Sequence, residues 1–584
     1  MYRQVTNPLD NLALSALLAS APLLVLLVLL GIVRMRSHWA ALTGLGTAVL
    51  IAVAGYDMPF HLAADGAAEG AVFGLFPIVW IVLNAVWINK LQRASGHFDI
   101  IGRTFSSVSA DIRIQAVLIA FCFGAMIESL SGFGTPIAIT SLLLLTLGLE
   151  PLKAAAIAVF ANTAPAAFGS VGNPIQTLAK VTSYSEHDIG VMVGRQSAII
   201  SVLVPFALLL ILDGRRGLRE VWPVALTAGL GFGIGQFLCS NYFAYQLTDL
   251  VAALVSMAAV VSLLRWWRPR GSVEPALAKP ESVSFGTTAA AGAEPVVVDA
   301  GPVVVATAGG SGAGQPSAGP GAWVAPRGEA APRPVHDPRR EVLKAFSPYA
   351  ILTVLFALVS YRGPVSRFVD EQDVSFHWPG LDVVGHTGKP VSITTFDFHW
   401  LGAAGTMLLL TGLLTILVLR VSPGRALRCY GEAFHQIRWA TVTIACILAL
   451  SYVMNLSGMA LSLGTWFAGA GSAFALLSGL LGWFGVALTG SDTSSNALFG
   501  AMQVSAAKEV GISPLLMAAT NSTGGVQGKA AAMQNLVIAA SAVGLSGREG
   551  DILRKVIGWS LGVLAVLCVL AWLQSTSVLG WMVP

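Results

Sequence analysis

The feature that most constrains this chain is the recurrence of long apolar stretches from Leu12 to the C-terminus. The clearest of them cover 13–33, 114–127 with a continuation to 149, 197–212, 399–419 and 556–573. A helix of about 20 apolar residues crosses the roughly 30 Å hydrocarbon core of a bilayer. Only 11% of the 584 residues are charged, against roughly 25% in soluble domains. We therefore predict an all-α polytopic membrane protein with about 11–14 membrane elements.

The first apolar stretch is predicted to remain as a membrane helix. Asp10 precedes it and Arg34 and Arg36 follow it, which is a poor match to a cleaved secretory signal. Lysines and arginines cluster between the apolar stretches, and assigning these clusters to the cytoplasm predicts that both termini lie outside. The expected location is the cytoplasmic membrane, with the lipid bilayer as a partner. The net charge of +4 gives no support for nucleic-acid binding.

Cysteine and histidine usage argues against a metal site or a disulfide framework. The five cysteines are scattered and the nine histidines form no HExxH-type pair. No catalytic triad, metal set or nucleotide loop stands in a suitable context. The sequence therefore predicts no enzymatic activity, no cofactor and no metal.

Composition divides the chain into two halves. Residues 269–340 are rich in Gly, Ala, Pro, Ser and Val without helical periodicity, which is typical of a disordered linker and here predicts a cytoplasmic one. The predicted domains are an N-terminal transmembrane half, 1–268, this linker, and a C-terminal transmembrane half, 341–584. A polar insert at 364–398 is expected to face the outside.

Each half carries two polar, glycine-rich interruptions. They are "SGFGTP" (131–136) and "ANTAPAAFGSVGNP" (161–174) in the first half, and "TGSDTSS" (489–495) and "TNSTGGVQGK" (520–529) in the second. The spacing from Gly132 to Asn162 is 30 residues and that from Gly490 to Asn521 is 31. We predict two inverted repeats, each with a hairpin and a discontinuous helix. Chance similarity among membrane helices rich in small residues is the alternative.

Broken backbone inside a membrane is tolerated only where protein buries it or water reaches it. Helix N-termini exposed there present oriented amides to an anion. The interruption at 487–496 is accordingly predicted to be a membrane hairpin tip. Asp492 and Asn496 would share a face if the tip continues as a helix.

Three isolated charges coincide with these interruptions. Glu128 is the only acid between Asp111 and Glu150. Asp492 and Lys529 are similarly isolated in the second half. A charge within a membrane span is costly, so its default interpretation is functional. Glu128 and Asp492 are candidates to carry a proton or order a site, with a structural partnership as the alternative. Lys529 is a candidate seat for a carboxylate, with snorkelling to the headgroups or pairing with Asp492 as alternatives.

Motifs at these residues resemble the L-lactate permease family. The matching stretches are "FDIIGRTFSS" (98–107), "FCFGAMIESLSGFGTPIAIT" (121–140), "NTAPAAFG" (162–169), "VGRQ" (193–196), "GWFGVALTGSDTSSNALFGAMQ" (482–503) and "STGGVQGK" (522–529). The resemblance is collinear over nearly the whole chain except 269–340. It departs after Lys529, where the family commonly has Met-Ile-Ser-Pro-Gln and this chain has Ala-Ala-Ala-Met-Gln.

The resemblance implies a secondary transporter that imports L-lactate and related 2-hydroxy monocarboxylates, D-lactate and glycolate among them, by proton symport. Glu128 and Asp492 are then the proton-coupling candidates. Lys529 and amides near 490–495 and 521–525 would hold the carboxylate. The substrate-binding candidates are Gly132, Gly134, Thr135, Asn162, Thr163, Gly490, Ser491, Thr493, Ser494, Asn521, Ser522, Thr523, Gly524 and Lys529.

Two other functions remain open from the sequence. A sodium-coupled carboxylate carrier would use the same broken backbone, with carbonyl and hydroxyl groups around the ion. A channel or a substrate sensor is the second alternative. The sequence leaves the oligomeric state open, a homodimer included.

Overall fold

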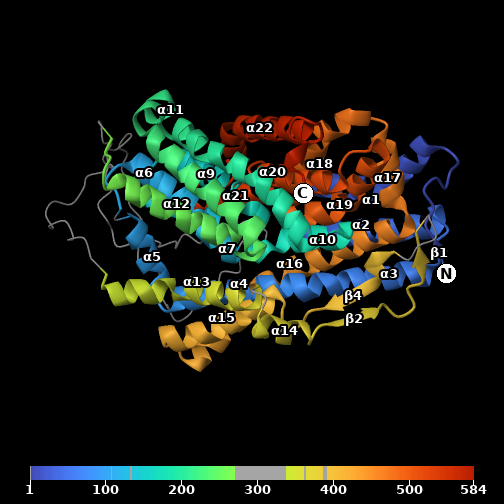
Figure 1. Ribbon diagram of the computed structural model, residues 1–584, viewed down its shortest axis with the longest axis horizontal. Helices are drawn as coiled ribbons and strands as arrows, with labels where there is room; N and C mark the ends of the chain where they lie inside the picture. The colour runs from blue at the N-terminus through green and yellow to red at the C-terminus, as the bar shows by residue number, and fades with distance from the viewer. Residues whose placement is uncertain are drawn as a thin grey trace, which may run out of the picture.

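The computed structural model describes residues 2–33, 35–106, 108–131, 134–269, 337–360, 363–385 and 391–584. The predicted linker falls almost wholly outside these ranges. The chain folds into a bundle of helices with a few short strands at one end (Figure 1). The N-terminus and the strands lie at the right-hand end of Figure 1, and α5 and α6 lie at the left-hand end.

The elements of the first half are almost all helical. They are β1 (Tyr2–Arg3), α1 (Leu12–Gly31), α2 (Ser37–Gly55), α3 (Phe60–Phe73), the π-helical η1 (Gly74–Val79), α4 (Trp80–Ala94), α5 (His97–Ser106), α6 (Ile112–Ala116), the π-helical η2 (Val117–Phe123), α7 (Gly124–Ser131), α8 (Thr135–Thr146), α9 (Pro151–Ala161), η3 (Ala166–Phe168), α10 (Gly169–Thr182), α11 (Glu186–Tyr242), η4 (Tyr245–Leu247) and α12 (Thr248–Leu264).

The second half adds further helices and the outer strands. Its elements are α13 (Arg339–Ser360), α14 (Pro364–Asp370), β2 (Val374–His377), β3 (Val383–Val384), η5 (Ser392–Thr394), β4 (Thr395–Phe398), α15 (Ala404–Leu419), α16 (Pro423–Ser457), α17 (Met459–Ala468), η6 (Gly471–Ala473), α18 (Phe474–Thr489), α19 (Asp492–Val510), α20 (Pro514–Gly528), α21 (Met533–Ala542), α22 (Glu549–Gln574) and η7 (Gly580–Met582).

Helix boundaries follow from local sequence signals. The Asn11 side chain accepts hydrogen bonds from the amides of Ala13 and Leu14 and so begins α1. Proline stands in the first turn of α9, α16 and α20, where its missing N–H would have no helical partner anyway. Gly214 has φ +61° and turns the chain sharply within α11.

Within the described ranges, ten helices are long and apolar enough to cross a membrane. The count becomes eleven when α9 and the segment Ala166–Thr182, bent by 58° at their junction, are taken as one broken span. The all-α polytopic class is thereby confirmed. The ten or eleven candidate spans compare with the roughly 11–14 membrane elements expected from the sequence. The hairpin at α18–α19 and the break between α9 and α10 lie where the sequence predicted them. The inverted relation of the two halves stays a prediction.

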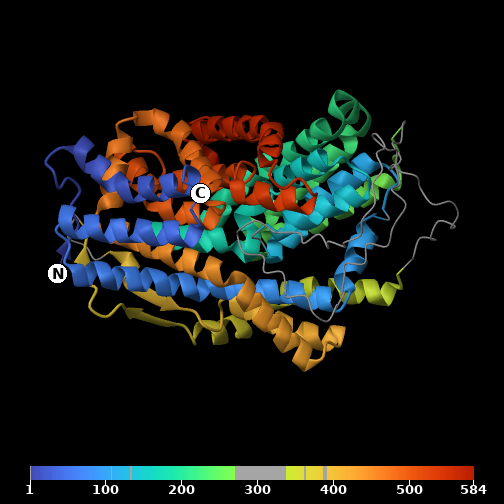
Figure 2. The same ribbon diagram turned by 180° about the vertical axis from the view of Figure 1, so that it is seen from behind.

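Two large apolar clusters divide the bundle. One joins α1, α2 and α3 to α16 and α17, and the other joins α6 to α9 with α11, α12, α21 and α22; a smaller third cluster joins α10 to α20. Figure 2 shows the N-terminal helices, drawn in blue, stacked at one end of the molecule. Both clusters contain residues from both halves of the sequence. The halves are therefore interlocked, and the boundary between the clusters is where a site can form.

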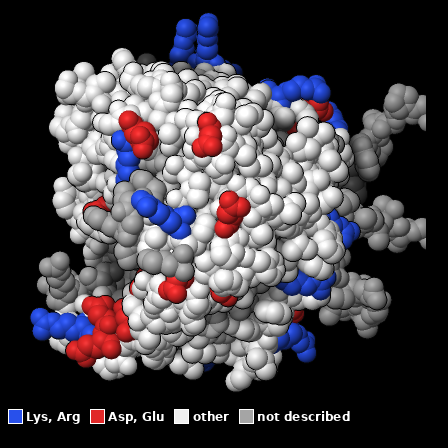
Figure 3. Space-filling view, turned by 90° about the vertical axis from the view of Figure 1, so that its right-hand side faces the viewer, with Lys and Arg blue, Asp and Glu red and all other residues white. Residues whose placement is uncertain are grey.

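The predicted polar insert folds against the N-terminal end of the bundle. Strand β1 pairs in parallel with β3, and β2 pairs antiparallel with β4 in the register Val374 to Phe398. The Phe76 and Phe398 rings pack against each other, with their centroids 4.8 Å apart. Most of this end of the molecule is uncharged at its surface, and the charged side chains stand mainly apart from one another (Figure 3).

Candidate functional site

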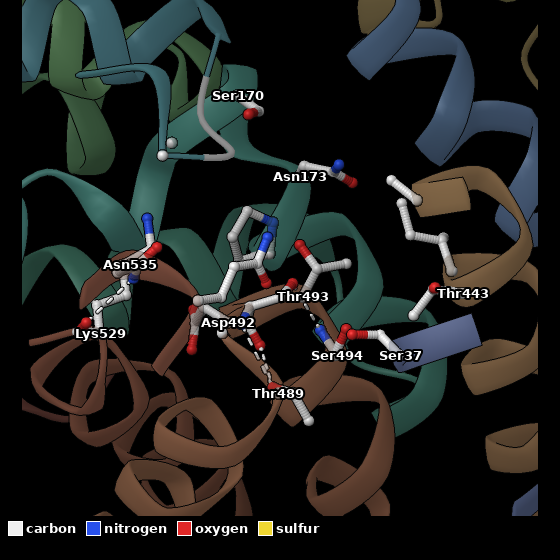
Figure 4. A pocket seen from close by; sticks show the side chains of 18 of the residues that line it. Ser37, Ser170, Asn173, Thr443, Thr489, Asp492, Thr493, Ser494, Lys529 and Asn535 are labelled. Carbon is white, nitrogen blue, oxygen red and sulfur yellow. Dashed lines mark hydrogen bonds between the residues drawn. The ribbon is translucent and has the colours of Figure 1, made fainter. Parts of the chain in front are cut away.

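A cavity of about 140 Å³ lies where α2 and α16 face α10 and α19. One water molecule needs roughly 10–15 Å³ of such space. The cavity can therefore hold several waters or one small organic molecule. Lys529 lies on one side of it, Ser37 and Thr443 lie on the other, and Asp492 lies between them (Figure 4).

Lys529 and Glu128 form a buried ion pair at the cavity wall. The Lys529 Nζ lies 2.6 Å from Glu128 Oε1. Asn162 supports both partners, because its Nδ2 donates to Glu128 Oε2 at 3.0 Å and its Oδ1 accepts from Lys529 Nζ at 3.5 Å. Glu128 is 2% exposed and Lys529 is 8% exposed. The partner of Lys529 is thus Glu128, and not the Asp492 that the sequence suggested as an alternative.

Asp492 is the first residue of α19 and is 3% exposed. Its Oδ2 accepts from Ser522 Oγ at 2.6 Å and from Asn496 Nδ2 at 3.3 Å. The second contact confirms that Asp492 and Asn496 share one helix face. Among the described residues, Asp492 Oδ1 has no hydrogen-bond partner although it is buried. A buried acceptor without a donor is costly, and this oxygen packs against Gly525 of α20, where an added Cβ would collide with it.

The hairpin tip between α18 and α19 places a helix N-terminus at the cavity. Gly490 ends α18 with φ +76°, and a Cβ there would lie 2.6 Å from Gln534 Oε1. The Ser491 hydroxyl caps α19 by accepting from the Ser494 amide at 3.3 Å. The backbone N–H groups of Asp492 and Thr493 lie in the first turn of α19, where a helix offers them no carbonyl acceptor. This arrangement can bind a small anion.

The second break in the backbone lies between α9 and α10. Ser170, Val171 and Gly172 have φ of +48°, +58° and +75°. For the two non-glycine residues, this left-handed conformation costs of order 1–3 kcal/mol each. Asn173 follows directly, lines the cavity, and has a buried Oδ1 without a partner. The strained segment aims an amide side chain into the site.

The predicted interruption at 520–529 is corrected by the structure. Helix α20 continues without a break to Gly528, so the amides of 521–525 bond within the helix. They are unable to hold a carboxylate. The glycines serve close packing instead, since a Cβ on Gly524 would lie 2.6 Å from Gly479 Cα. The chain leaves the helix only over 529–532, which presents Lys529 to the cavity.

Eight of the predicted residues come together around the cavity. They are Glu128, Gly134, Gly490, Ser491, Asp492, Thr493, Ser494 and Lys529. Asn162 and Ser522 lie behind this wall, where they bond to the two acids. Gly132 lies outside the described residues.

The other predicted residues face away from the cavity lining. Thr163 donates to its own helix at Phe160 O. Thr523 donates to Gln196 Oε1 at 2.6 Å. Asn521 bonds to Asn496 and Gln503. Gly524 packs against α18, and Thr135 is absent from the lining. The contacts of Asn521, Thr523 and Gly524 hold α20 in place rather than facing a ligand.

The wall formed by α2 and α16 was missed from the sequence. His38 is buried and stacks on Trp439, with ring centroids 4.4 Å apart. Ser37 and Thr443 stand beside them in the lining. These residues lie in ordinary apolar helices with no local break, so no sequence signal marks them. Asn535 stands six residues after Lys529 in the sequence, and its Nδ2 donates to Lys529 O at 3.0 Å.

A helical bundle enclosing a small polar cavity, walled by broken helices and buried ionisable side chains, is the architecture of a multi-pass membrane transport protein. The sequence profile described as L-lactate permease matches residues 15–309 and 329–578. The chain belongs to the L-lactate permease family. Membership in a permease family makes it a transporter rather than an enzyme.

Several characterised relatives match along their full length. The glycolate permease GlcA of Escherichia coli (strain K12) is 36% identical over 593 residues, which cover 100% of this chain and 99% of that protein. The L-lactate permease of Bacillus subtilis (strain 168) is 36% identical over 603 residues, and that of Escherichia coli (strain K12) is 35% identical over 596, each with 100% of both chains covered. The solved YdaH transporter of Alcanivorax borkumensis aligns with 86% of each chain at 13% identity and a TM-score of 0.43, too low to support an argument.

Proposed function

We propose that the protein carries lactate, glycolate and related 2-hydroxy monocarboxylates across the membrane together with protons. The observation that carries this proposal is the buried Lys529–Glu128 pair at the wall of a cavity of about 140 Å³. A cation, a titratable acid and a helix N-terminus then share one small site. The names of the relatives, lactate and glycolate permeases, support the substrate class.

The groups at the cavity match the groups of a 2-hydroxy acid. The substrate carboxylate would bind Lys529 Nζ and the amides at the start of α19. The substrate hydroxyl would donate to the carboxylate of Asp492, which lines the cavity. A 2-hydroxy acid therefore satisfies both requirements, whereas a 2-oxo acid satisfies the first alone.

The ion pair suggests how proton and substrate are coupled. While Glu128 is ionised it holds Lys529 at 2.6 Å and competes with any incoming carboxylate. A proton on Glu128 cancels that attraction and leaves Lys529 free to bind the substrate anion. Each loaded state would then hold one proton and one anion, so the charge within the buried site is conserved. The cavity lies between α2 and α16 on one side and α10 and α19 on the other, and relative movement of these two walls would alternate its exposure.

The test uses purified protein in liposomes that enclose a pH dye. An inward gradient of L-lactate, D-lactate, glycolate or pyruvate is applied, and protein-free liposomes correct for diffusion of the uncharged acids. We expect the wild type to acidify the lumen with the hydroxy acids. Glu128→Gln should lose the acidification and keep counterflow of labelled lactate. The exposed acid Glu150 provides a matched control, because Glu150→Gln should behave as wild type.

Two outcomes would contradict the proposal. Acidification that persists in Glu128→Gln would remove Glu128 from the coupling. Uptake that disappears when choline replaces sodium at fixed pH would indicate sodium coupling instead.

A further inference from the structure

A second buried acid lies away from the cavity and has no role in the mechanism above. Glu69 on α3 is 0% exposed, and neither carboxylate oxygen has a hydrogen-bond partner among the described residues. The Tyr452 hydroxyl on α16 is also fully buried and unpartnered. The two helices touch at this level, since a Cβ on Gly70 would lie 2.9 Å from Tyr452 Cγ. An acid and a hydroxyl are thus buried together without being satisfied.

Lys180 is a base whose charge acts on Glu69. It stands in the last turn of α10, and its Nζ donates to Thr395 O at 2.7 Å and to Asp397 Oδ2 at 3.1 Å on strand β4. Lys180 and Asp397 are both close enough to act on the charge of Glu69. Lys180 therefore links α10 to the insert at 364–398. Its charge also acts on Glu69, a carboxyl group without a hydrogen-bond partner among the described residues.

The remaining titratable neighbours do not neutralise Glu69. Asp65 lies one turn earlier on α3 and faces the insert, where a Cβ on Gly380 would lie 3.2 Å from its Oδ2. His399 pairs with Asp373 at 2.6 Å and also acts on Asp397. Tyr452 is the titratable group from α16. An ionised carboxylate without donors is costly in this apolar setting, which favours the protonated form of Glu69.

Asp397 is not the group that would release Lys180 near neutral pH. Partial burial raises the pKa of Asp397, but the Ser375 hydroxyl and the Lys180 ammonium favour its carboxylate more strongly, and the net effect lowers that pKa. Because its pKa is lowered, Asp397 stays ionised down to a more acidic pH than an ordinary aspartate. Its ion pair with Lys180 is therefore lost only in acid. A change of partner near neutrality must come from another group.

We propose that Glu69 is a proton-binding site whose deprotonated form draws Lys180 away from both Asp397 and Thr395 O and thereby releases α10 from the insert at 364–398. Tyr452 would then donate its hydroxyl to the ionised Glu69, which gives both unpartnered groups a role. The link to transport rests on the proposed function. Lys180 follows the cavity residue Asn173 by seven positions on the same helix, about 10 Å at 1.5 Å per residue. Movement of α10 at Lys180 would therefore reach the cavity.

The first test detects the proton directly and needs no substrate. Infrared difference spectra of the full chain in lipid nanodiscs are recorded between acidic and alkaline pH. We expect the wild type to lose a protonated-carboxyl band as the pH rises, and Glu69→Gln to lack that component. Tyr452→Phe should shift its loss to higher pH, because ionised Glu69 loses a donor. Glu371→Gln removes an exposed acid of the insert and should leave the band unchanged.

The second test measures the release of the insert. Hydrogen exchange of β2 and β4, corrected for the intrinsic pH dependence, should lose protection as the pH rises in wild type. Glu69→Gln should stay protected throughout, and Asp397→Asn should be less protected than wild type at every pH, because Lys180 then keeps only its bond to Thr395 O.

Each alternative outcome would overturn the proposal. A wild type without the band, or a band that survives in Glu69→Gln, removes Glu69 as a proton site. Hydrogen exchange of β2 and β4 that does not change with pH would rule out the exchange of partners by Lys180. A change in protection that requires sodium would show that Glu69 binds a cation instead of a proton. Failure of lactate transport in liposomes would leave these measurements untouched, so the two proposals fail separately.

Discussion

Lys529 and Glu128 stand 401 residues apart in the chain, yet their side chains meet at 2.6 Å. Each was recognisable from the sequence as an isolated charge, and each satisfies the other in the structure. Removing one partner of a buried ion pair leaves an uncompensated charge, whereas removing both charges does not. The stability of this region should therefore depend on charge balance more than on either residue.

A double-mutant cycle tests this dependence. We expect Lys529→Met to lower the free energy of unfolding by about 3–5 kcal/mol. The pair Lys529→Met with Glu128→Gln should recover most of the loss. Unfolding in detergent measures both, and Lys508→Met, at an exposed lysine of α19, serves as the control. Additive losses in the double variant would contradict a coupled pair.

Asp492 should decide between hydroxy and oxo acids. If its carboxylate accepts the substrate hydroxyl, wild type should bind L-lactate roughly 10- to 100-fold more tightly than pyruvate, the range for a hydrogen bond to a charged group. Asp492→Asn should reduce that ratio. Competition against labelled lactate in counterflow measures this affinity ratio. Glycolate keeps the hydroxyl and lacks the methyl group, so it should also bind more tightly than pyruvate. Equal binding of lactate and pyruvate by wild type would remove this role.

At the scale of elements, glycine has two opposite uses in this fold. Gly490 ends a helix in the left-handed conformation, within the hairpin tip that the sequence predicted. Gly524 and Gly528 stay inside α20 and let it lie against α18. The sequence treated both as breaks, because a glycine-rich segment is equally compatible with unwinding and with close packing. The helix that packs against such a segment decides which of the two occurs. For α20 that helix is α18, which contributes Gly479 and Gly482 at the contact.

Gly482 tests the close contact between α18 and α20. A Cβ there would lie 2.8 Å from Asn521 C and 3.0 Å from Asn521 Cα, which are backbone atoms that can move only with the helix. We expect Gly482→Ala to lower the free energy of unfolding by about 1–3 kcal/mol. Gly562 on α22 has open space around it, so Gly562→Ala should be neutral or stabilising by up to about 1 kcal/mol. Thermal unfolding compares the two, and equal effects would refute the packing argument.

At the scale of the whole molecule, the two halves hold each other together. Gln196 in the first half donates to Thr520 and to Gln574 in the second, each at 2.9 Å. The Asn496 side chain donates to Pro174 O at 3.2 Å. The cavity itself is lined from both halves. Assembly therefore depends on contacts between the halves more than on the segment that connects them.

Splitting the chain between its halves tests this dependence. We expect residues 1–300 and 301–584, expressed together as two chains, to purify as one complex through a tag on either chain. The complex should retain lactate counterflow, while each chain expressed alone should aggregate because its cluster surfaces are incomplete. Failure of the two chains to associate would show that the connecting segment is needed for assembly.

The sequence by itself determined the membrane class, the positions of the hairpin tip and the first broken helix, and the three isolated charges. These follow from hydropathy, turn chemistry and charge, which are properties of short windows of the chain. Only the tertiary structure decided that Lys529 pairs with Glu128, that α20 stays helical, that α2 and α16 close the cavity, and that Glu69 lacks a partner. Each of these depends on which helices pack together, and that choice is made between residues far apart in the sequence.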